Sequence, residues 1–472
     1  MRECPLQRRA GSLEGGTGAG GARKGEERSV MRQKTWTRRS FVRLSMLALA
    51  SAGVPGAASA QDGSLGWPFF QNAPEKASRD DRRQPEPMHD LRTSNVPLRS
   101  DVMVEALEKA IERYQEIVNA GGWPTIPAAR SIRIEDDDER LPLVRRRLAV
   151  SGEFQKRTAS LGDFSGDDLE GAVRRYQEAN GLRPTGRLDK YTLQTMNISA
   201  QARLQQMRIN LQRLRDLVGQ RLEDRYIVVN AASFQLEAVE RFEVQQRHRV
   251  IVGKPERQTP TVKAQVRALN FFPYWRVAES VASLDLIPKL QREPDYLQKE
   301  QIRVLTGSFN GPEIDATRID WRSADAHKIK FRQDPGPQNA LGLLRLDMPN
   351  EHGVYMHDTP MKQLFNSRGR SFSAGCVRVQ DVYKLGEWVA RNEVGWSEPG
   401  RVQDVLDRGQ PLDLTLTRPV PVYFTYITAW AEPDGRIQFR PDIYGRDGVR
   451  ELHPGNERDP SDGPAPAFAL AP

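Results

Sequence analysis

The chain has 472 residues, of which 38% are hydrophobic, and this is enough for two or three globular domains with hydrophobic cores. Its formal net charge is +8, but residues 1–60 hold 11 Lys and Arg against 4 Asp and Glu, a surplus of +7, so the rest carries about +1. Nucleic-acid binding needs a concentrated basic surface, so this distribution argues against a nucleic-acid-binding protein.

The first 60 residues have the order of an export signal. Arg38 and Arg39 precede an apolar run over 44–54, and the small-residue sequence Ala58-Ser59-Ala60 fits a cleavage site. The paired arginines resemble the twin-arginine type of signal, and the apolar run is too short for a transmembrane helix. We therefore expect a protein exported to the periplasm, with no membrane span left after cleavage.

The next part of the chain alternates between polar and helical patterns. Residues 61–100 are rich in Pro, Asp, Arg and Gln without apolar periodicity, which predicts a linker. Apolar residues at helical spacing predict a helix over 102–118, and 141–197 reads as helices joined by a Gly- and Pro-containing turn, with Asp189 capping the last. Together, residues 101–223 are expected to form a helical scaffold.

Apolar residues alternate with a period of two from about Asp224, which predicts a β-rich domain that extends to 447. The alternation is interrupted over 274–338 by a helical, Pro-punctuated stretch, and a long insertion of this kind is commonly a lid over a site. The Pro-, Asp- and Gly-rich tail, 448–472, is expected to be disordered. The predicted fold class is α+β: a small helical domain, then a mixed β-rich domain with an inserted helical lid.

The chain holds two cysteines, Cys4 and Cys376, so cleavage of the signal would leave Cys376 as the sole thiol. It cannot form an internal disulfide and is therefore either buried and inert or retained for its reactivity. Composition alone favours burial, because free cysteine is among the most buried residue types. The neighbouring sequence favours reactivity, because an imidazole such as that of His357 can take the proton of a thiol and pair with the resulting anion.

His357 and the run Ser373-Ala374-Gly375-Cys376-Val377-Arg378, after a strand ending in VYM, resemble the catalytic signature of the L,D-transpeptidases. Residues 141–197 resemble a small peptidoglycan-binding module. With the insertion, the arrangement is most similar to the large periplasmic, lid-bearing branch of that family. Many members have a second histidine directly before the Gly-Cys, where this chain has Ala374; the lid-bearing branch often lacks it too. The resemblance implies a YkuD-type catalytic domain over 224–447.

The resemblance also implies a reaction. Cys376 would attack the diaminopimelate carbonyl of a tetrapeptide stem of peptidoglycan, D-alanine would leave, and an amine of a second stem would resolve the thioester into a 3→3 cross-link. The alternatives are L,D-carboxypeptidase activity, attachment of an outer-membrane protein to peptidoglycan, and a non-enzymatic scaffold that binds the wall. Carbapenems acylate enzymes of this family and are expected inhibitors. No cofactor is implied, and the six histidines show no metal-ligand spacing.

The base and the oxyanion donors can be assigned to residues. His357 is preferred over His352 for two reasons. The two residues are an odd number of positions apart, so on a strand their side chains would point to opposite faces, and His352 lies in an expected turn. Gly375 permits close backbone approach, so its amide and that of Cys376 are candidate donors to a developing oxyanion. The resemblance implies that the backbone carbonyl of Asp358 orients the imidazole; the carboxylate of Asp358 is the alternative, but adjacent strand residues point apart.

Further residues are candidates for substrate contacts. Arg378 lies two residues past the cysteine, where its guanidinium is placed to pair with a substrate carboxylate; a solvated surface arginine is the alternative. Trp275 is a candidate apolar wall that keeps water from a thioester, with packing inside the lid as the alternative. Ser373, Tyr355 and Asn339 are candidates for hydrogen bonds to a peptide.

Overall fold

The computed structural model describes residues 90–128, 130–153, 166–219 and 223–452, all within one compact unit of the chain, Gln71–Pro472. The predicted signal segment, most of the predicted linker and residues 453–472 lie outside the described residues. Within the described ranges, no helix has the length and apolar character needed to cross a bilayer.

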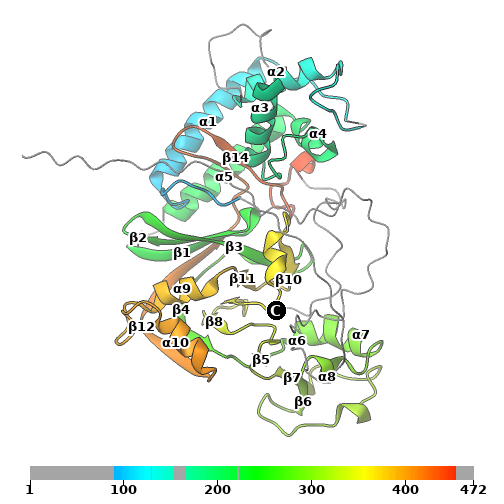
Figure 1. Cartoon of the computed structure of the whole chain (residues 1–472), viewed down its shortest axis with the longest axis vertical. Helices are drawn as coiled ribbons and strands as arrows, with labels where there is room; N and C mark the ends of the chain where they lie inside the picture. Colours follow the sequence, from blue (N-terminus) through cyan, green and yellow to red (C-terminus); the bar gives the residue numbers. More distant parts are fainter. Residues whose placement is uncertain (1–89, 129, 154–165, 220–222, 453–472) are drawn as a thin grey trace, which may run out of the picture. The chain divides into compact units, whose positions relative to one another are not determined.

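Helices dominate the first described part (Figure 1). They are α1 (Asp101–Asn119), α2 (Leu141–Ser151), α3 (Gly166–Ala179), α4 (Lys190–Met196) and α5 (Ala200–Val218). The predicted cap of α4 is confirmed, because the carboxylate of Asp189 accepts a hydrogen bond from the amide of Thr192 at 2.7 Å. A cluster of buried side chains joins α2, α3 and α4, and includes Val144, Val173 and Leu193.

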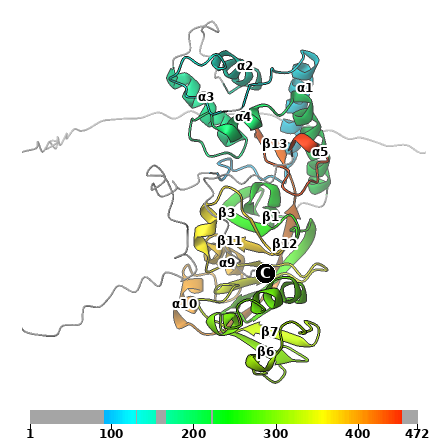
Figure 2. The same cartoon turned by 90° about the vertical axis from the view of Figure 1, so that its right-hand side faces the viewer.

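A nine-stranded mixed sheet follows (Figures 1 and 2). Its strands are β1 (Arg225–Asn230), β2 (Gln235–Glu240), β3 (Glu243–Gly253), β4 (Val262–Phe271), β8 (Leu344–Asp347), β9 (Met356–His357), β10 (Ser371–Ser373), β11 (Val377–Val379) and β12 (Leu412–Thr425). Their order is β10-β3-β11-β9-β8-β4-β12-β1-β2, and β2 also pairs with β3, so the order closes on itself. The same domain also holds two helices, α9 (Val382–Ala390) and α10 (Arg401–Arg408), and a hairpin of β13 (Ala429–Ala431) and β14 (Ile437–Phe439). It has short 3-10 turns at Ala231–Ser233, Lys362–Asn366 and Arg450–Leu452.

The sheet is buried on both faces around β1. Ile227 and Val229 belong to the core that β1 shares with α9, whereas Tyr226 and Val228 belong to a second core formed with α1 and α5. The continuous apolar run of this strand is therefore what two-sided burial requires. The predicted α+β class, with a helical domain before a mixed β-rich domain, is confirmed.

The segment 90–100 is not the linker that the sequence predicts. The guanidinium of Arg92 lies 2.6 Å from Glu237 and 2.7 Å from Glu432, all three side chains being nearly inaccessible. Leu98 is buried in the core beside α1. The prediction was wrong here because it relied on apolar periodicity, whereas this segment is held mainly by buried ion pairs, which leave no such periodicity.

We define the lid as residues 274–338. It has a core of its own and holds β5 (Trp275–Arg276), α6 (Glu279–Val281), a π-turn at Ala282–Leu286, α7 (Ile287–Leu290), α8 (Tyr296–Lys299), β6 (Ile302–Thr306), a 3-10 turn at Ala316–Arg318 and β7 (Ile329–Gln333). The prediction of a wholly helical insertion was incomplete, because β5, β7 and β6 form a three-stranded antiparallel sheet.

Candidate active site

Five side chains share one face of the sheet where three strands meet. β11 runs parallel to β9 with Arg378 opposite His357, and β9 runs antiparallel to β8 with His357 opposite Arg345. Cys376 and Tyr355 stand two residues before Arg378 and His357, so strand alternation places all five on this face. A 3.0 Å backbone hydrogen bond from the amide of Val377 to the carbonyl of Tyr355 continues the pairing to the residue before β9.

The opposite face of the same strands fixes this arrangement. The alternate residues are fully buried in the main hydrophobic core, and they are Val377, Val379, Met356, Leu344 and Leu346. A shift of one residue in any of these strands would turn the apolar set out of the core, so the core holds the register that brings the polar residues together.

Cys376 is buried, with 7% of the residue exposed. Burial raises its pKa to about 11, although hydrogen bonding by the backbone and hydroxyl of Tyr355 and the charges of Arg378 and Arg345 act in the opposite direction. At neutral pH the thiol is therefore protonated in this structure, and a base is needed to activate it.

His357 supplies an acceptor for that proton. The residue is fully buried, and neither ring nitrogen hydrogen-bonds to another described residue. Burial and then the charge of Arg378 lower the pKa of His357 well below its usual 6.5, while backbone groups of Asp358 and Leu341 oppose the shift. The imidazole is thus neutral at pH 7.

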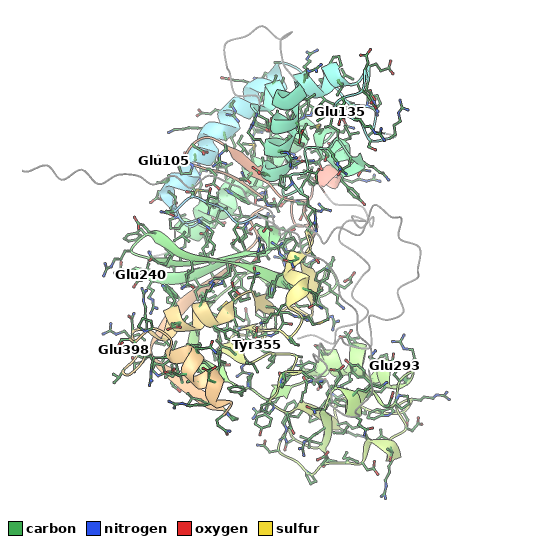
Figure 3. All side chains as sticks on the ribbon, viewed as in Figure 1. Glu105, Glu135, Glu240, Glu293, Tyr355 and Glu398 are labelled. Carbon is green, nitrogen blue, oxygen red and sulfur yellow. The ribbon has the colours of Figure 1, made fainter. Side chains whose placement is uncertain are left out.

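Tyr355 and His352 also have defined places. The ring of Tyr355 meets that of His357 edge to face at 5.6 Å, and its position is labelled in Figure 3. His352 lies exposed in the turn before β9. The two-residue strand does not extend to His352, so the turn, and not strand alternation, separates the two histidines.

The loop that carries the cysteine is held by Ser373. Its hydroxyl donates to the carbonyl of Cys376 at 2.6 Å and accepts from the amide of Gly375 at 3.1 Å. Ser373 is fully buried and both of these hydrogen bonds shape the loop, while its predicted contact with substrate stays a prediction. The Gly375 amide is engaged by this hydroxyl, which leaves the Cys376 amide as the candidate oxyanion donor of the predicted pair. Gly375 itself has a φ of +124°, a conformation that other residues rarely adopt.

The carboxylate of Asp358 points into a separate cluster. It accepts hydrogen bonds from the amide of Leu343 at 3.1 Å and from the hydroxyl of Tyr383, and it forms an ion pair with Lys362. The carboxylate is therefore used to tie β8, β9 and α9 together. The carboxylate of Asp358 is therefore engaged away from the imidazole, and orientation of His357 by the backbone carbonyl of Asp358 stays a prediction.

Arg378 is buried, at 2% exposed, so the alternative of a solvated surface arginine was wrong. Its guanidinium donates to the hydroxyl of Thr359 at 3.3 Å, and no Asp or Glu among the described residues forms an ion pair with it. Burial lowers its pKa to about 10, which keeps it charged at pH 7. A buried, unpaired cation of this kind favours an anionic ligand.

Arg345 is a site residue that the sequence reasoning missed. It donates to Asn270 and Asp347 at 3.0 Å each, and its guanidinium lies 5.3 Å from the ring centre of Tyr355. Strand alternation puts Arg345 and Asp347 on the face opposite the buried leucines of β8, but only the strand order places Arg345 beside His357.

The lid covers the loop of the cysteine. Tyr355 and Ala374 pack against the core of the lid, and Arg257, on the loop after β3, pairs with Asp285 of the lid at 2.8 Å. Trp275 is 2% exposed and packs inside that core, as the alternative to a substrate wall predicts.

The contacts of Asn339 lie within the protein. It is buried, its amide donates to the carbonyls of Pro273 at 3.1 Å and Asp334 at 3.0 Å, and its oxygen accepts from the amide of Leu341. Asn339 thus joins the beginning and the end of the lid, and its predicted contact with substrate stays a prediction.

Asn339→Ala is expected to lower the free energy of unfolding by roughly 2–4 kcal/mol, because the change leaves several buried backbone groups without partners. Urea unfolding followed by circular dichroism measures this value. Asn310→Ala, on the exposed surface of the same lid, is the matched control and should change the value by less than about 0.5 kcal/mol. Equal effects of the two changes would contradict the role given to Asn339.

Two segments of the chain match known protein families. Residues 224–411 match the family described as "L,D-transpeptidase catalytic domain" (YkuD), and residues 138–196 match the family described as "Putative peptidoglycan binding domain". A Haemophilus influenzae protein named "Putative L,D-transpeptidase" is 33% identical over 244 residues, which cover 52% of this chain and 48% of that protein. The chain therefore spans about half the length of this relative.

Two solved structures are also similar. The first is an L,D-transpeptidase from Mycobacterium smegmatis. The aligned part covers 43% of this chain and 58% of that protein's chain, with 12% identity and a TM-score of 0.21. An L,D-transpeptidase from Xylanimonas cellulosilytica covers 63% of this chain and 98% of its own, with 12% identity and a TM-score of 0.20.

The two family matches confirm the resemblance in the sequence. The segment that holds His357 and Cys376 matches the L,D-transpeptidase catalytic-domain family. A segment that matches the peptidoglycan-binding family precedes it in the chain.

Proposed function

We propose that this protein is an L,D-transpeptidase that forms 3→3 cross-links in peptidoglycan through a thioester on Cys376. The observation that carries the proposal is the pairing of β11 with β9, which places a buried thiol, a neutral imidazole and an unpaired arginine on one sheet face beneath the lid. Each of these groups has a role in acyl transfer.

In the first half-reaction, a ring nitrogen of His357 takes the thiol proton as Sγ of Cys376 attacks the diaminopimelate carbonyl of a tetrapeptide stem. The negative charge that develops on the carbonyl oxygen is stabilised by the Cys376 amide. The imidazolium then gives the proton to the departing amine, D-alanine leaves, and the thioester remains.

In the second half-reaction, the amine of a second stem attacks the thioester. His357 accepts the amine proton and returns it to the sulfur as the thioester breaks, so the thiol and the neutral imidazole are restored. Arg378 binds a carboxylate of the donor stem, because it is a buried cation with no acidic partner among the described residues. The lid excludes water, which would otherwise hydrolyse the thioester.

Muropeptide analysis tests this reaction. Sacculi incubated with the full chain are expected to gain dimers linked between two diaminopimelate residues, together with free D-alanine, as measured by mass spectrometry. Shortened stems without dimers would instead indicate L,D-carboxypeptidase activity. Transfer of the stem to a protein amine would indicate attachment of an outer-membrane protein to the wall.

The wall-binding role and the location are part of the same proposal. Residues 138–196 would hold the enzyme on peptidoglycan, and the twin-arginine-type signal would export it to the periplasm, where that polymer lies. In a scaffold without activity, Cys376→Ala would complement a deletion strain fully. Cell fractionation with Arg38 and Arg39 both changed to Lys tests the export route.

A further inference from the structure

Behind the cysteine, Thr259 holds the peptide that precedes it. The Thr259 hydroxyl donates to the carbonyl of Gly375 at 2.8 Å, and the residue is 1% exposed. Thr259 lies on the loop between β3 and β4, 116 residues before Gly375 in sequence. The loop thus contacts the Gly375–Cys376 peptide at its carbonyl.

This contact fixes the direction of one amide. A peptide unit is planar, and in the trans form its carbonyl and its amide hydrogen point in opposite directions. A carbonyl of Gly375 held toward Thr259 therefore turns the amide of Cys376 away from Thr259. Neighbouring peptides are held by other groups: Ser373 binds the Gly375 amide and the Cys376 carbonyl. None of these contacts uses the Cys376 amide.

Thr259 is itself held from two directions. Its hydroxyl accepts a hydrogen bond from the amide of Gly253 at 2.9 Å, so the hydroxyl proton is left for Gly375. Its amide donates to the hydroxyl of Tyr444 at 3.3 Å, and that hydroxyl donates to the carbonyl of Gly253 at 2.7 Å. A Cβ at position 253 would lie 2.1 Å from the carbonyl oxygen of Arg257, so only glycine fits this turn.

Tyr444 comes from outside the matched catalytic family segment, which ends at residue 411. Its ring stacks on Tyr426 at 5.1 Å with 16° between the planes, and the Tyr426 hydroxyl donates to Asp442 at 2.7 Å. The C-terminal segment of the described chain therefore supports the loop that supports the cysteine.

We infer that Thr259, locked in place by Tyr444, is a positioning residue that aims the Cys376 amide at the oxyanion formed during acylation. The inference rests on the proposed function, because it assigns the donor used in that reaction. Thr259 contacts neither thiol nor imidazole in these hydrogen bonds, so its effect acts through the peptide alone.

The test separates acylation from simple alkylation of the same sulfur. Attack on a carbapenem carbonyl develops an oxyanion, whereas displacement of iodide from iodoacetamide at a saturated carbon develops none. In the full chain, Thr259→Val should slow formation of the carbapenem adduct on Cys376 about 10- to 100-fold and leave its iodoacetamide alkylation rate within about 2-fold. Peptide mass mapping assigns each adduct to Cys376 and not to Cys4.

Two more variants complete the test. Thr259→Ser keeps the hydroxyl and should restore most of the acylation rate. Tyr444→Phe leaves Thr259 intact but removes its support, and should slow acylation by a smaller factor, again without changing alkylation; it replaces Thr259→Val if that variant does not fold.

Each result has one meaning. Unchanged acylation in Thr259→Val and Tyr444→Phe, or an equal loss of acylation and alkylation, would overturn the positioning role. Absence of any carbapenem adduct in the wild-type chain would instead contradict the proposed function.

Discussion

Cys376→Ala is expected to abolish cross-linking of sacculi and release of D-alanine, because no other thiol among the described residues can form the thioester. A carbapenem should add one drug mass to the wild-type chain and none to this variant, as measured by intact-mass spectrometry. The change removes one sulfur atom from the edge of the hydrophobic core, of which Cys376 is a member, and should lower the free energy of unfolding by no more than about 2 kcal/mol.

The matched control is Cys376→Ser, which keeps the shape of the side chain but has a hydroxyl with a much weaker nucleophilicity. It should fold like the wild type, bind sacculi to the same extent and show no turnover. An adduct that persists in Cys376→Ala would mean that the nucleophile lies elsewhere. Retained turnover in either variant would contradict the thioester mechanism.

The sequence predicted the β-rich domain well because its strands obey strict periods. Alternating or continuous apolar residues mark β1, β3 and β12 in the sequence, and burial of these residues in the core then sets the pairing register of the strands. The prediction from apolar periodicity was wrong for residues 90–100, because buried ion pairs and not apolar side chains mainly hold this segment. It also read β6 and β7 as part of a helical lid, because these short strands are separated by long polar loops.

The sequence predicted the reactive residues of the site, because their residue types have few uses other than this chemistry. A single thiol and an upstream histidine indicate a reactive pair, and both lie on the same sheet face. Asn339, Ser373 and Trp275 were predicted to contact substrate, and the structure shows a structural role for each. The sequence could not show that role, because these residue types serve structure as readily as binding.

Thr259 and Arg345 were missed for a different reason. Each acts through a contact between segments that are far apart in sequence, Thr259 with Gly375 and Arg345 with its cross-strand neighbour His357. No local pattern records such a contact. Knowledge of strand order is needed before either residue can be placed beside the reacting groups.

His357→Gln is expected to slow acylation of Cys376 by a carbapenem roughly 10²- to 10⁴-fold at pH 7. With a thiol pKa of about 11, roughly one molecule in 10⁴ is a thiolate at pH 7, so the reaction depends on the imidazole to take the proton. Glutamine keeps much of the size and polarity of the buried histidine but cannot act as a base.

The pH dependence distinguishes a base from a structural residue. The neutral imidazole is the active form, and burial keeps the pKa of His357 well below 6.5, so the wild-type rate should stay nearly constant as the pH falls from 8 to 6.5. In His357→Gln the thiolate must form by loss of a proton to water, so its rate should rise about tenfold per pH unit between pH 7 and 10. Stopped-flow acylation over this range measures both profiles. A wild-type rate that also rises tenfold per unit would show that solvent, and not His357, deprotonates the thiol.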